Sequence, residues 1–217
     1  MARTVITAGL EYEQELLAQG FKLIAGLDEA GRGAWAGPVA AAAVILPLDR
    51  PDLAEILAGV TDSKRLSPER RDELAPLIKE VALDWAVGRC TSKEIDELGI
   101  VAATKKAMAR ALRKLDLDPE HVLIDAINLD TDILPLEQQT RIIKGDQKSL
   151  SIAAASILAK VTRDRFMVAL DEQYPEYGFA NHKGYGTKEH RAGLTTHGPC
   201  TAHRHTFKPV MTWKQLL

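Results

Sequence analysis

The amino-acid sequence predicts an α/β domain in which an early antiparallel meander gives way to strands that are connected through helices. Short apolar runs alternate with segments of helical periodicity, and a long helical segment before residue 121 favours a crossover connection to the strand that follows it. A chain of 217 residues can bury one core without a disulfide or a metal. We therefore expect one domain over residues 1–217, with residues 1–20 as a helical lead-in.

The composition is that of an ordinary globular protein, with 46% hydrophobic residues, 27% charged residues and a net charge of -2. It argues against disorder and against a fibrous architecture. Basic residues gather in two stretches, 182–191 and 203–208, and a basic face on a neutral protein can still bind a polyanion. Cys90 and Cys200 are too few for a disulfide framework, and no stretch has the roughly 18 apolar residues that a membrane span needs. We expect a cytoplasmic protein without a membrane segment.

The first half of the chain predicts a helix, three strands and a second helix. The first helix covers residues 10–19 and ends at Gly20, and the apolar runs 22–27 and 38–46 predict strands joined by a glycine-rich turn. A third strand is expected over residues 83–91. Before it, Ser67 has the place of an N-cap and Pro68 that of the first helical residue, so a helix follows up to about residue 81.

The second half predicts alternating helices and strands. Thr91 and Glu94 have the spacing of a capping box, and the helical region that they open resumes after Gly99 and closes at Pro119. Strands are expected over residues 121–126 and 141–146, a long helix over residues 149–170 and a last helix over about 187–196. The apolar face of the helical region after Gly99 comprises Val101, Met108, Ala111, Leu112 and Leu115. The long helix has an apolar face of Leu150, Ala154, Ile157, Leu158, Val161 and Val168, and a second face of Ser149, Ser156, Lys160 and Arg163.

Three of the apolar runs end in acidic residues, which are Asp28 with Glu29, Asp125 and Asp146. If the three strands are parallel neighbours, the four carboxylates meet at one edge of the sheet, where open α/β folds bind their ligands. Two charges about 4 Å apart repel by roughly 4 kcal/mol near a protein surface, so such a cluster needs cations. All-oxygen ligands favour Mg²⁺ or Mn²⁺, and two such ions are the usual machinery for displacement at a phosphodiester.

These residues also have simpler interpretations. An aspartate after a strand is often only a turn former, and Gly31-Arg32-Gly33 can be a plain hairpin turn. The functional interpretation is that exposed backbone N–H groups and the Arg32 side chain hold a phosphate or a sugar hydroxyl beside a metal site. The stretch Asp62-Ser63-Lys64 is explained equally well as a loop with a local side-chain turn.

Tyr185 lies between two glycines, with Lys183 and Lys188 nearby, on a turn that we expect to be exposed. Such a ring suits stacking on a nucleotide sugar or base. An ordinary surface tyrosine explains the pattern as well, so both interpretations stay open.

Histidines and a cysteine gather near the C-terminus. They are close enough in sequence to suggest zinc, but their spacing does not match a closed zinc site. Their basic neighbours Arg204 and Lys208 suit contact with phosphate better. The residues concerned are His197, Cys200, His203 and His205.

Taken in order, several motifs resemble those of ribonuclease HII, a family that nicks RNA embedded in or paired with DNA. They are DEAGRG with GPV (28–39), DSK (62–64), LID (123–125), KGD running into SIAAASILAKVTRD (144–164) and HKGYGT (182–187). The resemblance covers almost the whole chain. It implies a ribonuclease H-like fold, with a mixed five-stranded sheet flanked by helices and a helical segment over about 171–217 that contributes to substrate binding.

The same resemblance implies the roles of the site residues. The catalytic, metal-binding acids are Asp28, Glu29, Asp125 and Asp146, with two Mg²⁺ or Mn²⁺ ions among them. Backbone groups of Gly31, Arg32 and Gly33 and the ring of Tyr185 recognise the ribose 2′-hydroxyl, the group that distinguishes a ribonucleotide from DNA. Ser63 and Lys64 help to hold the nucleic-acid backbone.

The predicted activity is cleavage on the 5′ side of a ribonucleotide, in an RNA/DNA hybrid or in ribonucleotide-containing duplex DNA, by a monomer. The products are 3′-hydroxyl and 5′-phosphate ends, as suits ribonucleotide excision repair. One alternative is a hybrid-binding module without catalysis, against which the four acids argue. Another is a phosphotransferase, which would need a Gly-x-x-x-x-Gly-Lys-Ser/Thr loop that is not in the sequence.

The segment between Asp125 and Asp146 departs from the family pattern. It is a few residues longer than usual and holds two further acids, Asp130 and Asp132.

Overall fold

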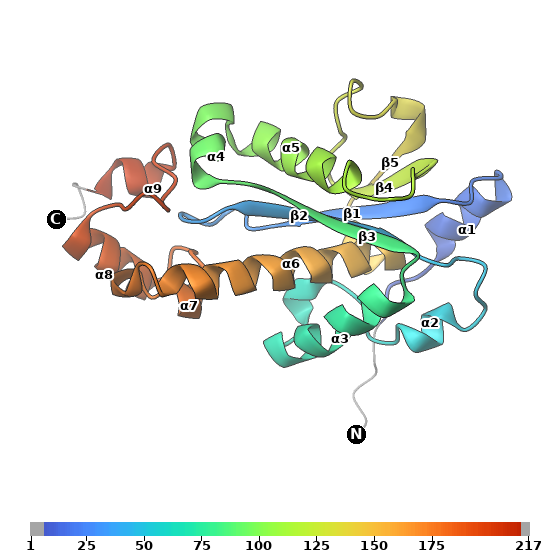
Figure 1. Ribbon diagram of the computed structural model, residues 1–217, viewed down its shortest axis with the longest axis horizontal. Coiled ribbons are helices and arrows are strands. Elements are labelled where there is room, and N and C mark those ends of the chain that lie inside the picture. Colours follow the sequence, from blue (N-terminus) through green and yellow to red (C-terminus); the bar gives the residue numbers. More distant parts are fainter. Residues whose placement is uncertain (1–6, 214–217) are drawn as a thin grey trace.

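The computed structural model describes residues 7–213, which form a five-stranded mixed sheet with helices on both faces (Figure 1). The strands are β1 (Ile24–Ala30), β2 (Val39–Ile45), β3 (Asp84–Cys90), β4 (His121–Asp125) and β5 (Gln139–Ile142). Their order in the sheet is β3-β2-β1-β4-β5. Strands β1 to β3 form an antiparallel meander, and β4 and β5 continue the sheet parallel to β1. The predicted α/β class and the mixed five-stranded sheet are confirmed.

The helices are α1 (Glu11–Ala18), α2 (Leu53–Ile56), α3 (Pro68–Val81), α4 (Ser92–Leu98), α5 (Ile100–Leu112), α6 (Leu150–Asp171), α7 (Phe179–His182), α8 (Lys188–His197) and α9 (Lys208–Met211). Short 3₁₀ turns cover Ser63–Arg65, Leu136–Gln138, Gly145–Gln147 and Pro175–Tyr177. The helical lead-in and the helical C-terminal segment are thus present, although residues 1–6 and 214–217 of those predictions lie outside the described residues. None of the helices between residues 7 and 213 is long and apolar enough to cross a membrane.

Helices cover the two faces of the sheet as separate layers (Figure 1). Helices α4 and α5 lie on one face, α6 and α3 on the other, and α7 to α9 gather at one end. The alanines of β2 are poor strand formers, but the strand is central and wholly buried. Its side chains alternate between the two layers, with Ala42 and Val44 facing the α6 side and Ala41 and Ala43 facing the α5 side. Small side chains there let both helical layers pack closely.

Capping residues fix where three helices begin, and two of these caps, at Ser67 and Thr91, were predicted. The Ser67 hydroxyl accepts a hydrogen bond from the first turn of α3, and Pro68 is the first residue of that helix. Thr91 and Glu94 make both hydrogen bonds of a capping box at α4. The Ser149 hydroxyl caps α6 in the same way as Ser67 caps α3. Each cap satisfies a backbone N–H that the helix itself leaves unpaired.

Two strand boundaries differ from the prediction. Strand β1 runs on to Ala30, so Asp28 and Glu29 lie within it and not after it, because the pairing with β2 continues through both acids. Strand β5 covers residues 139–142, and the segment predicted to complete it turns into the 3₁₀ helix Gly145–Gln147. Its partner β4 ends at Asp125, so no neighbour remains to extend the ladder.

Two helical predictions also need correction. Val101 and Val168 are 51% and 46% exposed, so neither belongs to the buried face of its helix. Helix α5 ends at Leu112, several residues before Pro119, because Lys114 and Leu115 make the shorter backbone hydrogen bonds of a tightened last turn. The remaining residues of the two predicted faces are buried or half-buried.

Candidate active site

The four predicted acids lie around the ends of the three parallel strands. Asp28 and Glu29 are in β1, Asp125 is the last residue of β4, and Asp146 is in the 3₁₀ turn after β5. Strands β1 and β4 are paired up to the residue before Asp28 and Asp125, which puts these two acids on adjacent strands at the same level. The backbone N–H of Gly145 donates to Asp125 Oδ1 at 2.8 Å and ties the turn that carries Asp146 to β4.

Burial and mutual repulsion raise the pKa values of Asp28, Glu29 and Asp146. Asp28 is only 4% exposed, and burial, with the charge of Glu29 and of the other acids behind it, holds its pKa well above the usual value. Burial also raises the pKa of Asp146 to about 6, and the charges of Asp62 and Asp125 add to the effect. The acids are therefore close enough to disfavour one another's ionised forms.

Two cations lie against this cluster. Arg32 Nη1 is 3.1 Å from Glu29 Oε1, and its charge opposes the effect of burial, which nevertheless leaves the pKa of Glu29 raised. Burial lowers the pKa of Lys64, but the charges of the surrounding acids, Asp28 foremost, outweigh it and leave that pKa above its ordinary value. Glu29 Oε2 is buried and has no hydrogen-bond partner. The cluster therefore has more negative charge than Arg32 and Lys64 offset.

The residues present fit a hard divalent cation by donor chemistry and by charge. The donors are all carboxylate oxygens, one of them is buried without a partner, and burial together with the charges of neighbouring acids raises the pKa values of Asp28 and Asp146. As they are placed, no three His, Cys, Asp or Glu side chains within residues 7–213 form a group that could hold a metal ion. The type and charge of the donor atoms therefore suit a divalent cation, but the side chains as placed do not form a complete coordination shell.

A hollow of about 600 Å³ opens beside the acids. Its walls include one of the acids and the six residues that the family resemblance assigned to substrate binding. They are Glu29, Gly31, Arg32, Gly33, Ser63, Lys64 and Tyr185. Tyr185 is 36% exposed, as expected for a ring that a ligand can reach. The fold thus brings together motifs that lie more than 150 residues apart in the sequence.

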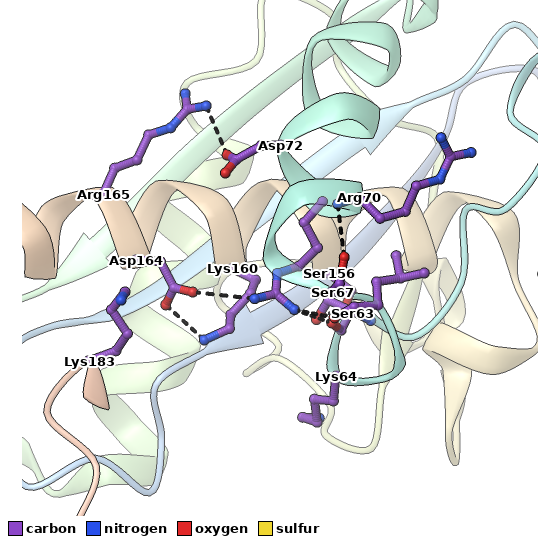
Figure 2. Close-up of polar contacts among 12 residues, drawn as sticks. Ser63, Lys64, Ser67, Arg70, Asp72, Ser156, Lys160, Asp164, Arg165 and Lys183 are labelled. Carbon is purple, nitrogen blue, oxygen red and sulfur yellow. Dashed lines mark hydrogen bonds and ion pairs between the residues drawn. The ribbon is translucent and has the colours of Figure 1, made fainter. Parts of the chain in front are cut away.

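The segment that carries Ser63 and Lys64 is held against α6 and α3. The Ser156 hydroxyl of α6 donates to Ser63 Oγ at 2.8 Å and accepts from the Ser63 N–H at 3.3 Å (Figure 2). Asp62 Oδ1 accepts from the Lys64 N–H at 2.9 Å, which is the local side-chain turn that the sequence suggested. Arg71 Nη1 donates to the Ser63 carbonyl at 2.9 Å. The side-chain turn of Asp62 is therefore formed, and Ser63 and Lys64 on it line the hollow.

Arg71 and Lys160 also line the hollow, although the sequence analysis did not assign them to the site. Asp164 pairs with both, and Figure 2 draws its contact with Lys160. Its Oδ1 is 2.7 Å from Lys160 Nζ, and its Oδ2 is 3.8 Å from Arg71 Nη2. Lys160 lies on the polar face predicted for the long helix, so a signal for it existed. Arg71 had none, because its place depends on how α3 packs against α6.

Gly31 and Tyr185 meet through a buried arginine. Gly31 has a φ of +95°, and a Cβ there would lie 1.9 Å from Arg163 Nε, so the position requires glycine. The Tyr185 ring lies over the Arg163 guanidinium at 5.4 Å and near Lys160 Nζ at 5.8 Å. Gly33 has open space where a side chain would be. The Gly31-Arg32-Gly33 turn and Tyr185 are therefore neighbours in the structure.

The C-terminal histidines do not form a zinc site among the described residues. His203 is buried, and its two ring nitrogens contact His190 and Cys200. Arg204 is buried as well, so the expectation that it contacts phosphate was wrong. Its guanidinium donates to the backbone carbonyls of Gly31, Arg32 and Gly37.

Comparison with known proteins agrees with this arrangement. The Ribonuclease HII family model matches residues 25–210. The chain is 53% identical to Ribonuclease HII of Halalkalibacterium halodurans over 201 residues, which are 93% of this chain and 73% of that one. The crystal structure of the ribonuclease H2 from Pyrococcus horikoshii OT3 superposes with a TM-score of 0.74 at 27% identity, over 89% of this chain and 97% of that one. Bst-RNase HIII in complex with Mn²⁺, 22% identical with a TM-score of 0.70 over 92% and 71% of the two chains, shares the fold. The chain therefore belongs to the ribonuclease HII family and is a ribonuclease H, a hydrolase that acts as an endonuclease.

Proposed function

We propose that the protein hydrolyses the phosphodiester on the 5′ side of a ribonucleotide, both in RNA/DNA hybrids and at single ribonucleotides embedded in duplex DNA. The products carry 3′-hydroxyl and 5′-phosphate ends. The observation that carries the proposal is the gathering of four carboxylates at one sheet edge, beside the hollow that Tyr185 and the Gly31-Arg32-Gly33 turn line.

In this proposal the four acids hold two Mg²⁺ or Mn²⁺ ions. When bound, such ions activate water and stabilise the leaving oxygen of an in-line displacement. Asp28, Glu29, Asp125 and Asp146 contribute the oxygen ligands, and those with raised pKa values give up their protons as the cations bind. No side chain forms a covalent bond with the substrate, because water is the nucleophile.

The residues of the hollow select and hold the substrate. Backbone groups of Gly31, Arg32 and Gly33 contact the ribose 2′-hydroxyl, and the Tyr185 ring packs against the same sugar. This hydroxyl lies in the accessible minor groove of the duplex, where a protein can distinguish RNA from DNA. Ser63 and Lys64 contact the phosphodiester backbone, for which the anchored 3₁₀ turn and the Lys64 charge are suited.

One chain supplies every residue of this site, so we propose that a monomer is active. A hybrid-binding module without catalysis would need no cluster of carboxylates with raised pKa values, because such a cluster repels the phosphates of a nucleic acid. Burying several acids beside one another has an unfavourable free energy, and cations that bind to them for hydrolysis offset it.

A duplex with one embedded ribonucleotide tests the proposal. The protein is incubated with it in Mg²⁺, in Mn²⁺ and in EDTA, next to an all-DNA duplex of the same sequence, with labels on both ends of the ribonucleotide strand. We expect one nick 5′ of the ribonucleotide with either metal, no cleavage in EDTA and no cleavage of the all-DNA duplex. An intact substrate under every metal condition, or a nick on the 3′ side, would contradict the proposal.

A further inference from the structure

His203 and Arg204, two adjacent residues of the C-terminal segment, are completely buried and have no direct place in the hollow. Their backbone is attached to the chain that follows the Gly31-Arg32-Gly33 turn. His203 forms an isolated antiparallel bridge with Ala36, and the Arg204 N–H donates to the Trp35 carbonyl at 2.8 Å. From this position the two side chains extend to different elements of the proposed site.

The Arg204 side chain supports the glycine-rich turn. Its Nη2 donates to the Gly31 carbonyl at 2.7 Å, its Nη1 to the Arg32 carbonyl at 2.8 Å, and its Nε to the Gly37 carbonyl at 3.0 Å. Burial, followed by the nearby charge of Arg163, lowers the pKa of Arg204 to about 9, so the group stays a cation at neutral pH. A rigid planar fork presents donors to the three carbonyls from three separate nitrogens, whereas a lysine has all its donors on one nitrogen and cannot reproduce this geometry.

The His203 side chain supports the turn that carries Tyr185, through a second histidine. The Cys200 N–H donates to His203 Nδ1 at 3.1 Å. His203 Nε2 lies 3.1 Å from His190 Nε2, and His190 Nδ1 lies 3.1 Å from the Tyr185 carbonyl. A carbonyl only accepts, so His190 Nδ1 carries a proton; a backbone N–H only donates, so His203 Nδ1 carries none. The remaining contact is then a hydrogen bond from His203 Nε2 to His190 Nε2.

This assignment of protons makes both imidazoles neutral. Burial is the main cause that lowers the pKa of His190 to about 4 and that of His203 to about 3, which agrees with neutral rings at physiological pH. The chain of hydrogen bonds therefore has one direction, from the Cys200 N–H to the Tyr185 carbonyl. The two bonds that His203 makes need an acceptor and a donor held on opposite sides of a rigid ring, which the single flexible amide of glutamine does not reproduce.

Trp35 closes the Tyr185 turn from the opposite side. The backbone N–H of Trp35 donates to the Gly184 carbonyl at 2.8 Å. A Cβ at Gly186 would lie 2.1 Å from Trp35 Cζ2, so the indole ring packs directly on this glycine. The Trp35 and His190 rings pack against each other with centroids 5.4 Å apart. The turn is therefore confined between Trp35, which follows the glycine-rich turn, and His190, which His203 orients.

We infer that His203 and Arg204 are positioning residues that together set the placement of Tyr185 relative to the Gly31-Arg32-Gly33 turn, and thereby the selectivity for a ribonucleotide. Arg204 fixes one of the two elements and His203 fixes the other, from neighbouring positions on the same backbone. The inference rests on the proposed function, in which these two elements read the 2′-hydroxyl.

The inference is tested by selectivity in binding. Dissociation constants are measured in EDTA, where no cleavage follows, for a duplex with one ribonucleotide and for the matching all-DNA duplex. The variants are His203→Gln and Arg204→Lys. We expect each variant to reduce the preference for the ribonucleotide roughly 3- to 10-fold, the range of one or two lost hydrogen bonds, with all-DNA binding unchanged within about twofold.

His121→Gln is the matched control, because His121 is also a buried histidine with a side-chain hydrogen bond, to Thr140, but lies on β4. It is expected to keep the wild-type preference. Thermal unfolding of every variant by circular dichroism ensures that binding is measured on folded protein. If Arg204→Lys does not fold, His203→Gln carries the test alone.

A double-mutant cycle separates positioning from a general structural effect. If His203 acts through Tyr185, then Tyr185→Ala with His203→Gln has the same reduced preference as Tyr185→Ala alone. Losses that multiply, or an equal loss of binding to both duplexes, would overturn the inference. A wild-type protein without any preference for the ribonucleotide would instead contradict the proposed function, so the two failures can be told apart.

Discussion

At the scale of single residues, the main feature of the site is a cluster of carboxylates that outnumber the cations beside them. Asp62 belongs to this group although the sequence motif around it suggested only a turn. It is buried, it accepts hydrogen bonds from the Lys64 N–H and from Gln147 Nε2, and it raises the pKa of Asp146 more than Asp125 does. The repulsion is therefore spread over five acids, and the four proposed ligands are those at the ends of β1, β4 and β5.

Asp146→Asn is expected to abolish nicking and to leave substrate binding largely intact. The amide keeps the shape of the side chain but lacks the charge that a cation requires, so kcat falls by at least roughly a hundredfold. Single-turnover cleavage of the ribonucleotide duplex in Mg²⁺ and binding in EDTA measure the two effects. Asp132→Asn is the control, because Asp132 is an exposed acid of the same connecting segment. Wild-type turnover in Asp146→Asn would remove this residue from the site.

The raised pKa of Asp146 predicts a pH dependence of stability in metal-free protein. Its pKa is about 6 in the folded state against an ordinary value of 3.8, so the folded state binds more protons between these values. The free energy of unfolding therefore falls as pH rises from about 4 to above 6, by up to about 3 kcal/mol from this group. Urea unfolding in EDTA at several pH values measures it. The decrease should be smaller in Asp146→Asn, and an identical pH profile in the variant would contradict the assignment.

At the scale of helices and strands, local signals were sufficient to place most elements. Ser67 and Thr91 cap helices as predicted because capping depends on residues within one turn of each other. Strand ends were less predictable. Strand β1 was expected to stop before Asp28, since two acids are unusual in a buried strand, yet seven residues of β1 remain in the sheet. Pairing with β2 on one side holds Asp28 and Glu29 there, and such pairing is not a local property.

The close packing of α6 on β1 depends on Gly26. A Cβ at this position would lie 2.1 to 2.4 Å from backbone atoms of Ser151 and Ile152, and backbone cannot move aside as a side-chain end can. Gly26→Ala is therefore expected to lower the free energy of unfolding by about 1–3 kcal/mol or more, and to reduce nicking because β1 carries Asp28. Urea unfolding measures the first effect. Gly33→Ala should leave stability nearly unchanged, because no atom lies within 4 Å of the added Cβ.

At the scale of the whole molecule, the site joins segments that only the tertiary fold brings together. The sequence could single out the four acids and the motifs that line the hollow, because apolar runs that end in acids and the motif blocks are both local patterns. The roles of His203 and Arg204 were not, because Arg204 bonds to carbonyls about 170 residues earlier in the chain. Exposed and buried basic residues look alike in a sequence, so Arg204 was wrongly expected to face phosphate.

The distribution of charge suits the proposed binding of a polyanion, although the chain has a net charge of -2. A second hollow of about 530 Å³ shares Arg71, Lys160 and Tyr185 with the first. Its further lining includes Arg165 and Lys183, and Figure 2 shows Arg165 paired with an acid of α3 at the edge of this region. The two hollows form a continuous lining along α6 in which cations outnumber acids, and we expect the nucleic-acid backbone to follow it beyond the cleaved bond.

This path predicts a change in the salt dependence of binding. Each phosphate contact contributes about 0.9 to the slope of log K against log salt, so Arg165→Ala with Lys183→Ala should lower its magnitude by up to about 1.8. Both duplexes should be affected equally, because phosphate contacts do not distinguish ribose from deoxyribose. Fluorescence anisotropy in EDTA over a range of KCl concentrations measures the slope. Arg50→Ala with Arg113→Ala removes the same charge from exposed positions outside both hollows and should change the slope far less. Equal slopes for the two double variants would show that binding responds to net charge alone and that the backbone does not follow α6.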